Sequence, residues 1–208
     1  MLNKIFNMEN PFWTFANKLA DVVILELLWI ITCLPLFTAG AASSAFWHVT
    51  LRLSENTEGR VIRGYFTAFK KSFKTGTIVW LIQLAAALWI FLDAYICFKS
   101  DHVAAIFLVG FFLVLGAFWL MTSMFLYPLI GRFDFSAKKI IGNSAFLSLK
   151  HFPHTLCIIL LPAAAFAACY YFHSSFLLIA LPALAFYLDA MLYNWIFSLY
   201  MEENKAPL

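Results

Sequence analysis

The sequence predicts an all-α protein, a polytopic bundle of transmembrane helices arranged as consecutive hairpins. Of its 208 residues, 63% are hydrophobic and 12% are charged, and the mean hydropathy is +0.85. These values lie outside the range of soluble domains, so lipid is the expected solvent for most of the chain. Its long apolar stretches run for about 20 residues, the length at which a helix crosses the hydrocarbon core.

The second part of the chain is expected to contain two tight helical hairpins. The first hairpin turns through residues 99–102 and the second through residues 173–175. Each turn is too short to hold a soluble domain, and both must lie on the same side of the membrane. The four spans of these hairpins are predicted near 77–98, 103–127, 155–172 and 176–200.

Two readings of the N-terminal part fit the sequence. Both contain a span near 19–37, whereas the segment 40–53 is either a short second span or an interfacial segment. Gly40 and Ser44 belong to a small-xxx-small pattern, which lets helices approach closely and favours six spans over five. With five spans, the N-terminus would lie outside the cell. In both readings the residues 1–208 form a single transmembrane domain.

Charge predicts the orientation of the spans. Ten of the 14 Lys and Arg residues lie in the segments 52–75 and 128–154, whereas the hairpin turns on the opposite side hold only Lys99. Because cytoplasmic loops are enriched in Lys and Arg, both basic segments and the C-terminus are expected in the cytoplasm. The expected location is the cell membrane, with several spans.

The first basic loop, 54–76, has the pattern of an amphipathic helix at the membrane interface. Its aromatic residues follow helical spacing, with cations on the adjacent stripe. Such a helix can bind anionic lipid, each cation contributing about 1 kcal/mol near the surface. It could serve as a membrane anchor or as a docking surface for a cytoplasmic partner. The candidate contact residues are Arg63, Phe66, Phe69, Lys70, Lys71, Phe73 and Lys74.

Four polar residues inside the predicted spans are also candidates for function: Glu26, Asp93, Asp189 and Asn194. An ionisable group at membrane depth costs about 2.5–3.5 kcal/mol on insertion scales, so it usually has a role. Asp93 lies near the outer end of its span, where it can reach water. The other three could line a path for ions or protons, or form hydrogen bonds between helices.

The sequence contains no recognisable motif for catalysis or for cofactor binding. We find no GxxxxGK[ST], HExxH, GxSxG or dinucleotide fingerprint. His151 and His154 are three residues apart with Pro153 between them, at the start of a predicted span, and a metal site is not expected there. The net charge of +3 is too small to indicate nucleic acid binding. We therefore expect a protein that is not an enzyme and carries no cofactor.

Several short segments within about the first ninety residues carry a family resemblance. They are NKLAD at 17–21, LP at 34–35, TAG at 38–40, WHVTLRL at 47–53 and GYFTAFKKSFK at 64–74. These segments resemble the YesL family of bacterial membrane proteins, and Asn10-Pro11-Phe12 also fits that family. The segment 64–74 is similar to the family's loop pattern: an aromatic pair, then Ala-Phe-Lys, then Phe-Lys.

The resemblance implies a setting for the protein but no mechanism. The family is a domain of unknown function, found mainly in Gram-positive bacteria, and its genes often neighbour ABC-type carbohydrate uptake systems. It implies an accessory component of carbohydrate uptake in the bacterial cell membrane, whose partners are the lipid bilayer and ABC transporter subunits. No catalytic or binding residues carry over from the family. The alternative is a small self-contained transporter or channel that uses the buried acidic residues.

Overall fold

A computed structural model of the chain describes residues 11–57, 59–99, 103–172 and 177–203. These residues form helices and no strands, which confirms the predicted all-α class. The elements are α2 (Pro11–Cys33), the 3-10 turn η1 (Leu36–Thr38), α3 (Ala39–Ser54), α4 (Val61–Phe98), α5 (Val103–Arg132), α6 (Ala137–Lys150), α7 (Phe152–Phe172) and α8 (Leu177–Glu203).

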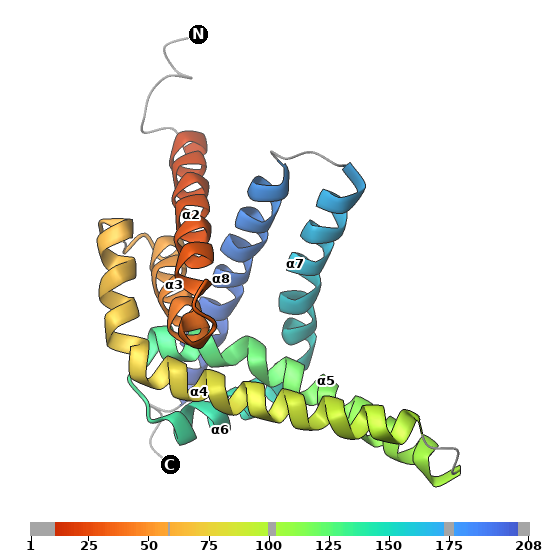
Figure 1. Ribbon diagram of the computed structural model, residues 1–208. Coiled ribbons are helices and arrows are strands. Elements are labelled where there is room, and N and C mark those ends of the chain that lie inside the picture. Colours follow the sequence, from red (N-terminus) through yellow and green to blue (C-terminus); the bar gives the residue numbers. More distant parts are fainter. Residues whose placement is uncertain (1–10, 58, 100–102, 173–176, 204–208) are drawn as a thin grey trace.

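Four of the described helices are long and apolar enough to cross a membrane, as expected for a membrane protein. These helical stretches, each of which contains an apolar window, are Val61–Phe98, Ala105–Arg132, Phe152–Tyr171 and Ala180–Met201. They pair into two hairpins, α4 with α5 and α7 with α8, which point in different directions (Figure 1). The predicted turns at 99–102 and 173–175 lie almost wholly outside the described residues. The number of spans, five or six, stays a prediction.

Helix α2 has different bounds from the span expected near 19–37. It begins at Pro11, since proline is favourable in the first turn, and ends at Cys33. Pro35 lacks an N–H group and disfavours helical backbone in the residue before it, so η1 turns the chain into α3 instead. Helix α2 contains Lys18, Asp21 and Glu26, and it is not among the four candidate spans.

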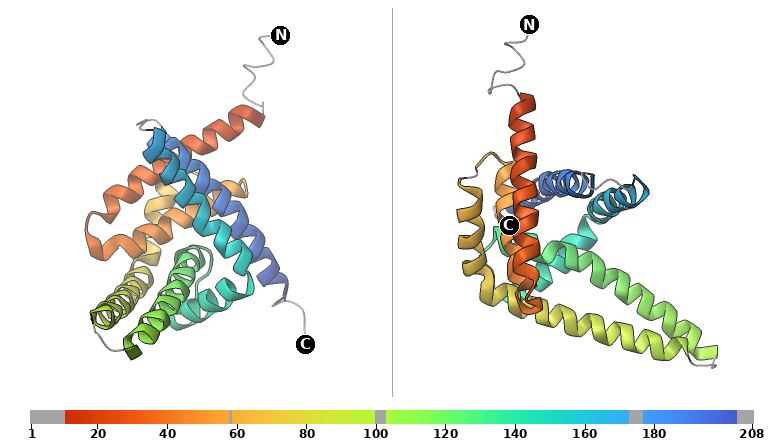
Figure 2. Two further views of the ribbon diagram at one scale, coloured as in Figure 1. Left: turned by 90° about the vertical axis from the view of Figure 1, so that its right-hand side faces the viewer. Right: turned by 45° about the horizontal axis from the view of Figure 1, so that its top comes forward.

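Helix α3 lies in the middle of the protein, in contact with α2, α4, α5 and α8 (Figure 2). The side chains of Ala41, Ala42 and Ala45 are fully buried there. Gly40 lies against the backbone of Gly76 in α4, so closely that a Cβ atom at residue 40 would collide with it. The small residues of this segment thus allow the close helix packing that their spacing predicts.

The basic loop predicted at 54–76 is largely helical. Residues 61–76 form the first turns of α4, which continues through the predicted span 77–98 as one helix of 38 residues. No proline interrupts this stretch, and a helix tolerates a glycine such as Gly76 at a cost of about 1 kcal/mol. The helix changes direction along its length, and its second part extends with α5 away from the other helices (Figure 1).

Two clusters of buried side chains form the core. One surrounds Tyr193 and Phe125 and joins α8 and α5 to α3 and α6. The other surrounds Tyr65 and Val22 and joins α4 and α2 to α3 and α8. The far parts of α4 and α5 instead carry many exposed large apolar side chains, such as Phe107, which suit contact with lipid.

A candidate site formed by an exposed basic helix face and a polar pocket

The first turns of α4 present one side to α3 and the opposite side outward. Tyr65, Ala68 and Ser72 are buried on the inner side. Phe66 and Phe73 are 43% and 39% exposed on the outer side, although both are apolar. We call the exposed residues of this side the outer face of α4: Ile62, Arg63, Phe66, Lys70, Phe73 and Lys74.

Two of the contact residues predicted from the sequence do not belong to this outer face, although the ring of Phe69 contacts that of Phe73 at its edge. Phe69 is half-buried and stacks on Tyr65, with 6.4 Å between the ring centroids. Lys71 extends toward the segment between α5 and α6, where its Nζ atom lies 2.7 Å from Oδ2 of Asp134. The structure therefore brings together Arg63, Phe66, Lys70, Phe73 and Lys74, and assigns Lys71 to a neighbouring pocket.

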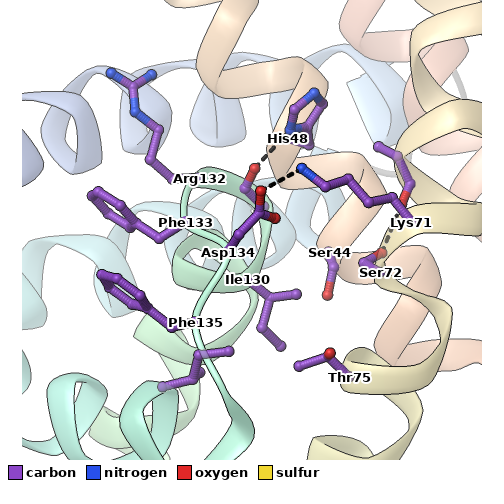
Figure 3. Close-up of a pocket in the computed structure, with 13 residues that line it drawn as sticks. Ser44, His48, Lys71, Ser72, Thr75, Ile130, Arg132, Phe133, Asp134 and Phe135 are labelled. Carbon is purple, nitrogen blue, oxygen red and sulfur yellow. Dashed lines mark hydrogen bonds and ion pairs between the residues drawn. The ribbon is translucent and has the colours of Figure 1, made fainter.

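That pocket has a volume of about 260 Å³ and lies between α3, α4, the end of α5 and the start of α6 (Figure 3). It exists because the residues at the contact of α3 with α4 are small, among them Ser44, Ala68 and Ser72. Its lining combines the polar residues Ser44, His48, Lys71, Ser72, Thr75, Arg132 and Asp134 with Ala68, Ile130, Gly131, Phe133, Phe135 and Ile140.

The polar groups of the pocket make defined contacts. Nδ1 of His48 lies 2.6 Å from the carbonyl oxygen of Gly131, which fixes the ring between α3 and α5. The ion pair between Lys71 and Asp134 closes one side of the pocket (Figure 3), but the two side chains are 64% and 76% exposed. An ion pair so exposed contributes at most about 1 kcal/mol, so a ligand can readily rearrange it.

A second pocket of about 180 Å³ lies across His48 and Gly131 from the first. The guanidinium of Arg132 points away from Lys71 (Figure 3) and pairs with Glu55 in this second pocket at 2.7 Å. The charge of Arg132 is therefore paired with that of Glu55, and its donors are directed away from the first pocket.

The buried polar residues predicted from the sequence do not line either pocket. Glu26 and Asp189 are 8% and 1% exposed, and among the described residues one carboxylate oxygen of each has no hydrogen-bond partner. Asn194 joins α8 to α3 by donating hydrogen bonds from Nδ2 to the Leu51 carbonyl at 2.8 Å and to Oγ of Ser54 at 2.6 Å. Asp93 is half-buried on the far part of α4.

The sequence analysis missed most of the residues in the polar pocket. Ser44 and His48 lie one helical turn apart on α3, but Thr75 and Asp134 come from two other segments, and no spacing along the chain relates the three segments. One signal was available, because Asp134 is the only acidic residue of the basic segment 128–154. An isolated acid among cations suggests an ion pair, but its partner Lys71 becomes known only from the fold.

Comparisons with known proteins place the chain beside proteins of unknown function. Residues 22–94 match a family described as "Protein of unknown function, DUF624". The chain is 26% identical over 151 residues, 72% of this chain and 71% of the relative, to the "Uncharacterized protein YesL" of Bacillus subtilis (strain 168). No solved structure matches. The two findings confirm the resemblance to the YesL family, and the region 22–94 includes the outer face of α4.

Proposed function

Starting from this similarity to the YesL family, we propose that the chain is an accessory membrane protein of carbohydrate uptake. In this proposal the outer face of α4 lies in the cytoplasm and binds a subunit of an ABC-type transporter. The supporting observation is the exposure of Phe66 and Phe73, which is costly in water unless lipid or protein covers them.

The outer face has two edges with different chemistry. At 3.6 residues per turn, Ile62, Phe66 and Phe73 share one edge, and the cations of the outer face occupy the other. Exposed aromatic residues and arginine are typical of protein interfaces, where aromatic anchors contribute much of the binding energy. The cationic edge would direct these anchors to a partner with an acidic surface.

The class of the partner follows from the family resemblance. Genes of the family often neighbour ABC-type carbohydrate uptake systems, so we propose a permease or nucleotide-binding subunit of such a system. Because the same cations also suit anionic headgroups, lipid would cover the outer face when the partner is absent.

The cationic edge can be tested with a double substitution, Lys70→Ser and Lys74→Ser. Losing two charges that face a partner should weaken binding by about tenfold, since each exposed ion pair contributes up to about 1 kcal/mol. The measurement is the recovery of permease or nucleotide-binding subunits with the tagged protein, purified from its host in mild detergent and quantified by mass spectrometry.

The matched control is Lys138→Ser with Lys139→Ser, which removes two exposed cations from α6 and leaves the outer face intact. The control should recover the transporter subunits at the level of the unmodified protein, and both variants should insert into the membrane equally. Equal recovery with both double variants, or no transporter subunit with the unmodified protein, would contradict the proposal.

A second candidate function, transport by this chain alone, is favoured by the burial of Asp189. A carboxyl group that is 1% exposed and has an oxygen without a partner among the described residues is typical of proton and ion sites in membranes. We expect such a transporter to carry ions or protons in liposomes, and Asp189→Asn to abolish the flux while Asp93→Asn retains it. Absence of flux over a range of pH and membrane potential would refute this candidate.

A further inference from the structure

We infer that the pocket beside α4 binds a small neutral ligand with several hydroxyl groups, either a single sugar ring or the polyhydroxyl headgroup of a lipid. The residues that would hold it are Ser44, His48, Lys71, Ser72, Thr75 and Asp134. The pocket's volume of about 260 Å³ lies just below the usual range for ligand sites, about 300–1,000 Å³, which limits the ligand to a small molecule or headgroup.

The serine hydroxyls in the pocket are available as acceptors. The hydroxyl of Ser44 donates to the carbonyl of Gly40 at 2.7 Å, and that of Ser72 donates to the carbonyl of Ala68 at 2.8 Å. A hydroxyl has one hydrogen to donate and two lone pairs that accept. Each serine therefore has its donor in use and its oxygen still able to accept a hydrogen bond.

His48 also presents an acceptor. The carbonyl of Gly131 can only accept, so the hydrogen bond at 2.6 Å assigns the ring hydrogen of neutral His48 to Nδ1. The other ring nitrogen, Nε2, then has a free lone pair. A ligand that hydrogen-bonds to this nitrogen must supply the hydrogen itself.

The ion pair contributes both a donor and an acceptor. The ammonium group of Lys71 has three hydrogens and Asp134 Oδ2 receives one of them, so others remain for a ligand. Oδ1 of Asp134 has no hydrogen-bond partner among the described residues and can accept. The hydroxyl of Thr75, on the same wall as Ser72, can donate or accept.

This set of groups favours hydroxyls over charged ligands. An anion needs donors, but it would find mainly Lys71 and Thr75, and the carboxylate of Asp134 would repel it. A cation would be repelled by Lys71 in the same way, and the carboxylate of Asp134 that could attract it is already paired with Lys71. A hydroxyl group can donate to Asp134 or His48 and accept from Lys71, and several hydroxyls on one small ring can do so together.

The position of the pocket allows the ligand to come from water or from lipid. It lies where the apolar helix α5 ends at Arg132 and where the basic first part of α4 faces it. A free sugar and the glycosyl headgroup of a lipid both carry hydroxyl groups on adjacent ring carbons. The hydrogen bonds to the pocket would therefore be of the same kind for either ligand. Binding requires only this chain, so it can be tested separately from the partner proposed for the outer face of α4.

The test is isothermal titration calorimetry on the purified full chain. Glucose, galactose and mannose are titrated into the protein in mild detergent, with inorganic phosphate as the anion probe. In a parallel arm, the protein is placed in nanodiscs with and without a glycosyl diacylglycerol, and bound lipid is counted by native mass spectrometry. We expect saturable binding of a neutral sugar in the first arm or specific retention of the glycolipid in the second.

Variants connect any binding to this pocket. Lys71→Ala and Asp134→Asn should each weaken binding by about tenfold or more, because hydrogen bonds to charged groups are among the stronger ones. Lys138→Ala removes an exposed cation outside the pocket and should leave the affinity unchanged. Binding of phosphate but no sugar or glycolipid, no binding in either arm, or equal affinity in all variants would overturn the inference.

Discussion

Gly40→Ala should lower the thermal unfolding temperature of the purified protein by about 5–10 °C, although it adds only one methyl group. The new Cβ would lie 2.1 Å from the carbonyl oxygen of Gly76 and 2.7 Å from Cβ of Trp80, so α3 and α4 would have to separate. Overpacking costs about 1–3 kcal/mol, and rigid backbone on both sides favours the upper end. For a chain of this size, about 1 kcal/mol corresponds to about 2–4 °C.

The control for this prediction is Gly110→Ala, in the apolar helix α5. A Cβ at residue 110 would meet no atom within 4 Å, and alanine favours a helix over glycine by about 1 kcal/mol. The control should therefore unfold at the same or a slightly higher temperature in the same detergent. If Gly40→Ala behaved like Gly110→Ala, α3 and α4 could not be packed backbone to backbone at this crossing.

Tyr193→Ala should destabilise the protein by about 3–5 kcal/mol, the usual cost of removing a large buried aromatic side chain. The ring is fully buried and lies edge-on to Trp47 and Phe125, with 5.0 and 5.4 Å between ring centroids. Its hydroxyl donates to the Met124 carbonyl at 2.7 Å. Because lipid is as apolar as a protein core, helices in a membrane depend on such packing rather than on the hydrophobic effect.

Two comparisons separate packing from other effects of this substitution. Tyr193→Phe keeps the ring and loses one hydrogen bond, so its expected cost is about 0.6–1 kcal/mol. Phe107→Ala removes a ring that is 78% exposed and should cost little. The measurement is unfolding in detergent followed by circular dichroism. A similar loss of stability in all three variants would contradict a central role for Tyr193.

The helices were predictable where local composition decides the structure. The apolar stretches near 77–98 and 103–127 lie within helices. Lipid cannot hydrogen-bond to backbone N–H and C=O groups, so these groups must pair with each other, as they do in a helix. The amphipathic spacing within 54–76 correctly predicted a helix, but its fusion with the following span was missed. The basic loop and the apolar span were treated as separate elements because their compositions differ, yet the hydrogen bonds of a helix do not depend on that difference.

The candidate site was predictable only in its outer part. The exposed cations and aromatics of α4 repeat at helical spacing, so a pattern within one segment identified them. Spacing alone did not show that Phe69 packs on Tyr65 or that Lys71 pairs with Asp134. Both contacts depend on which side of α4 faces the rest of the protein.

The sequence by itself determined that this protein is helical and apolar enough for a membrane, because these properties depend on composition and on patterns within single segments. The tertiary structure decided which surfaces meet. The central position of α3, the contact of Gly40 with Gly76 and the pocket between His48 and Asp134 all join residues far apart in the chain. Such contacts depend on the shapes of two helices together, and neither helix's sequence specifies them alone.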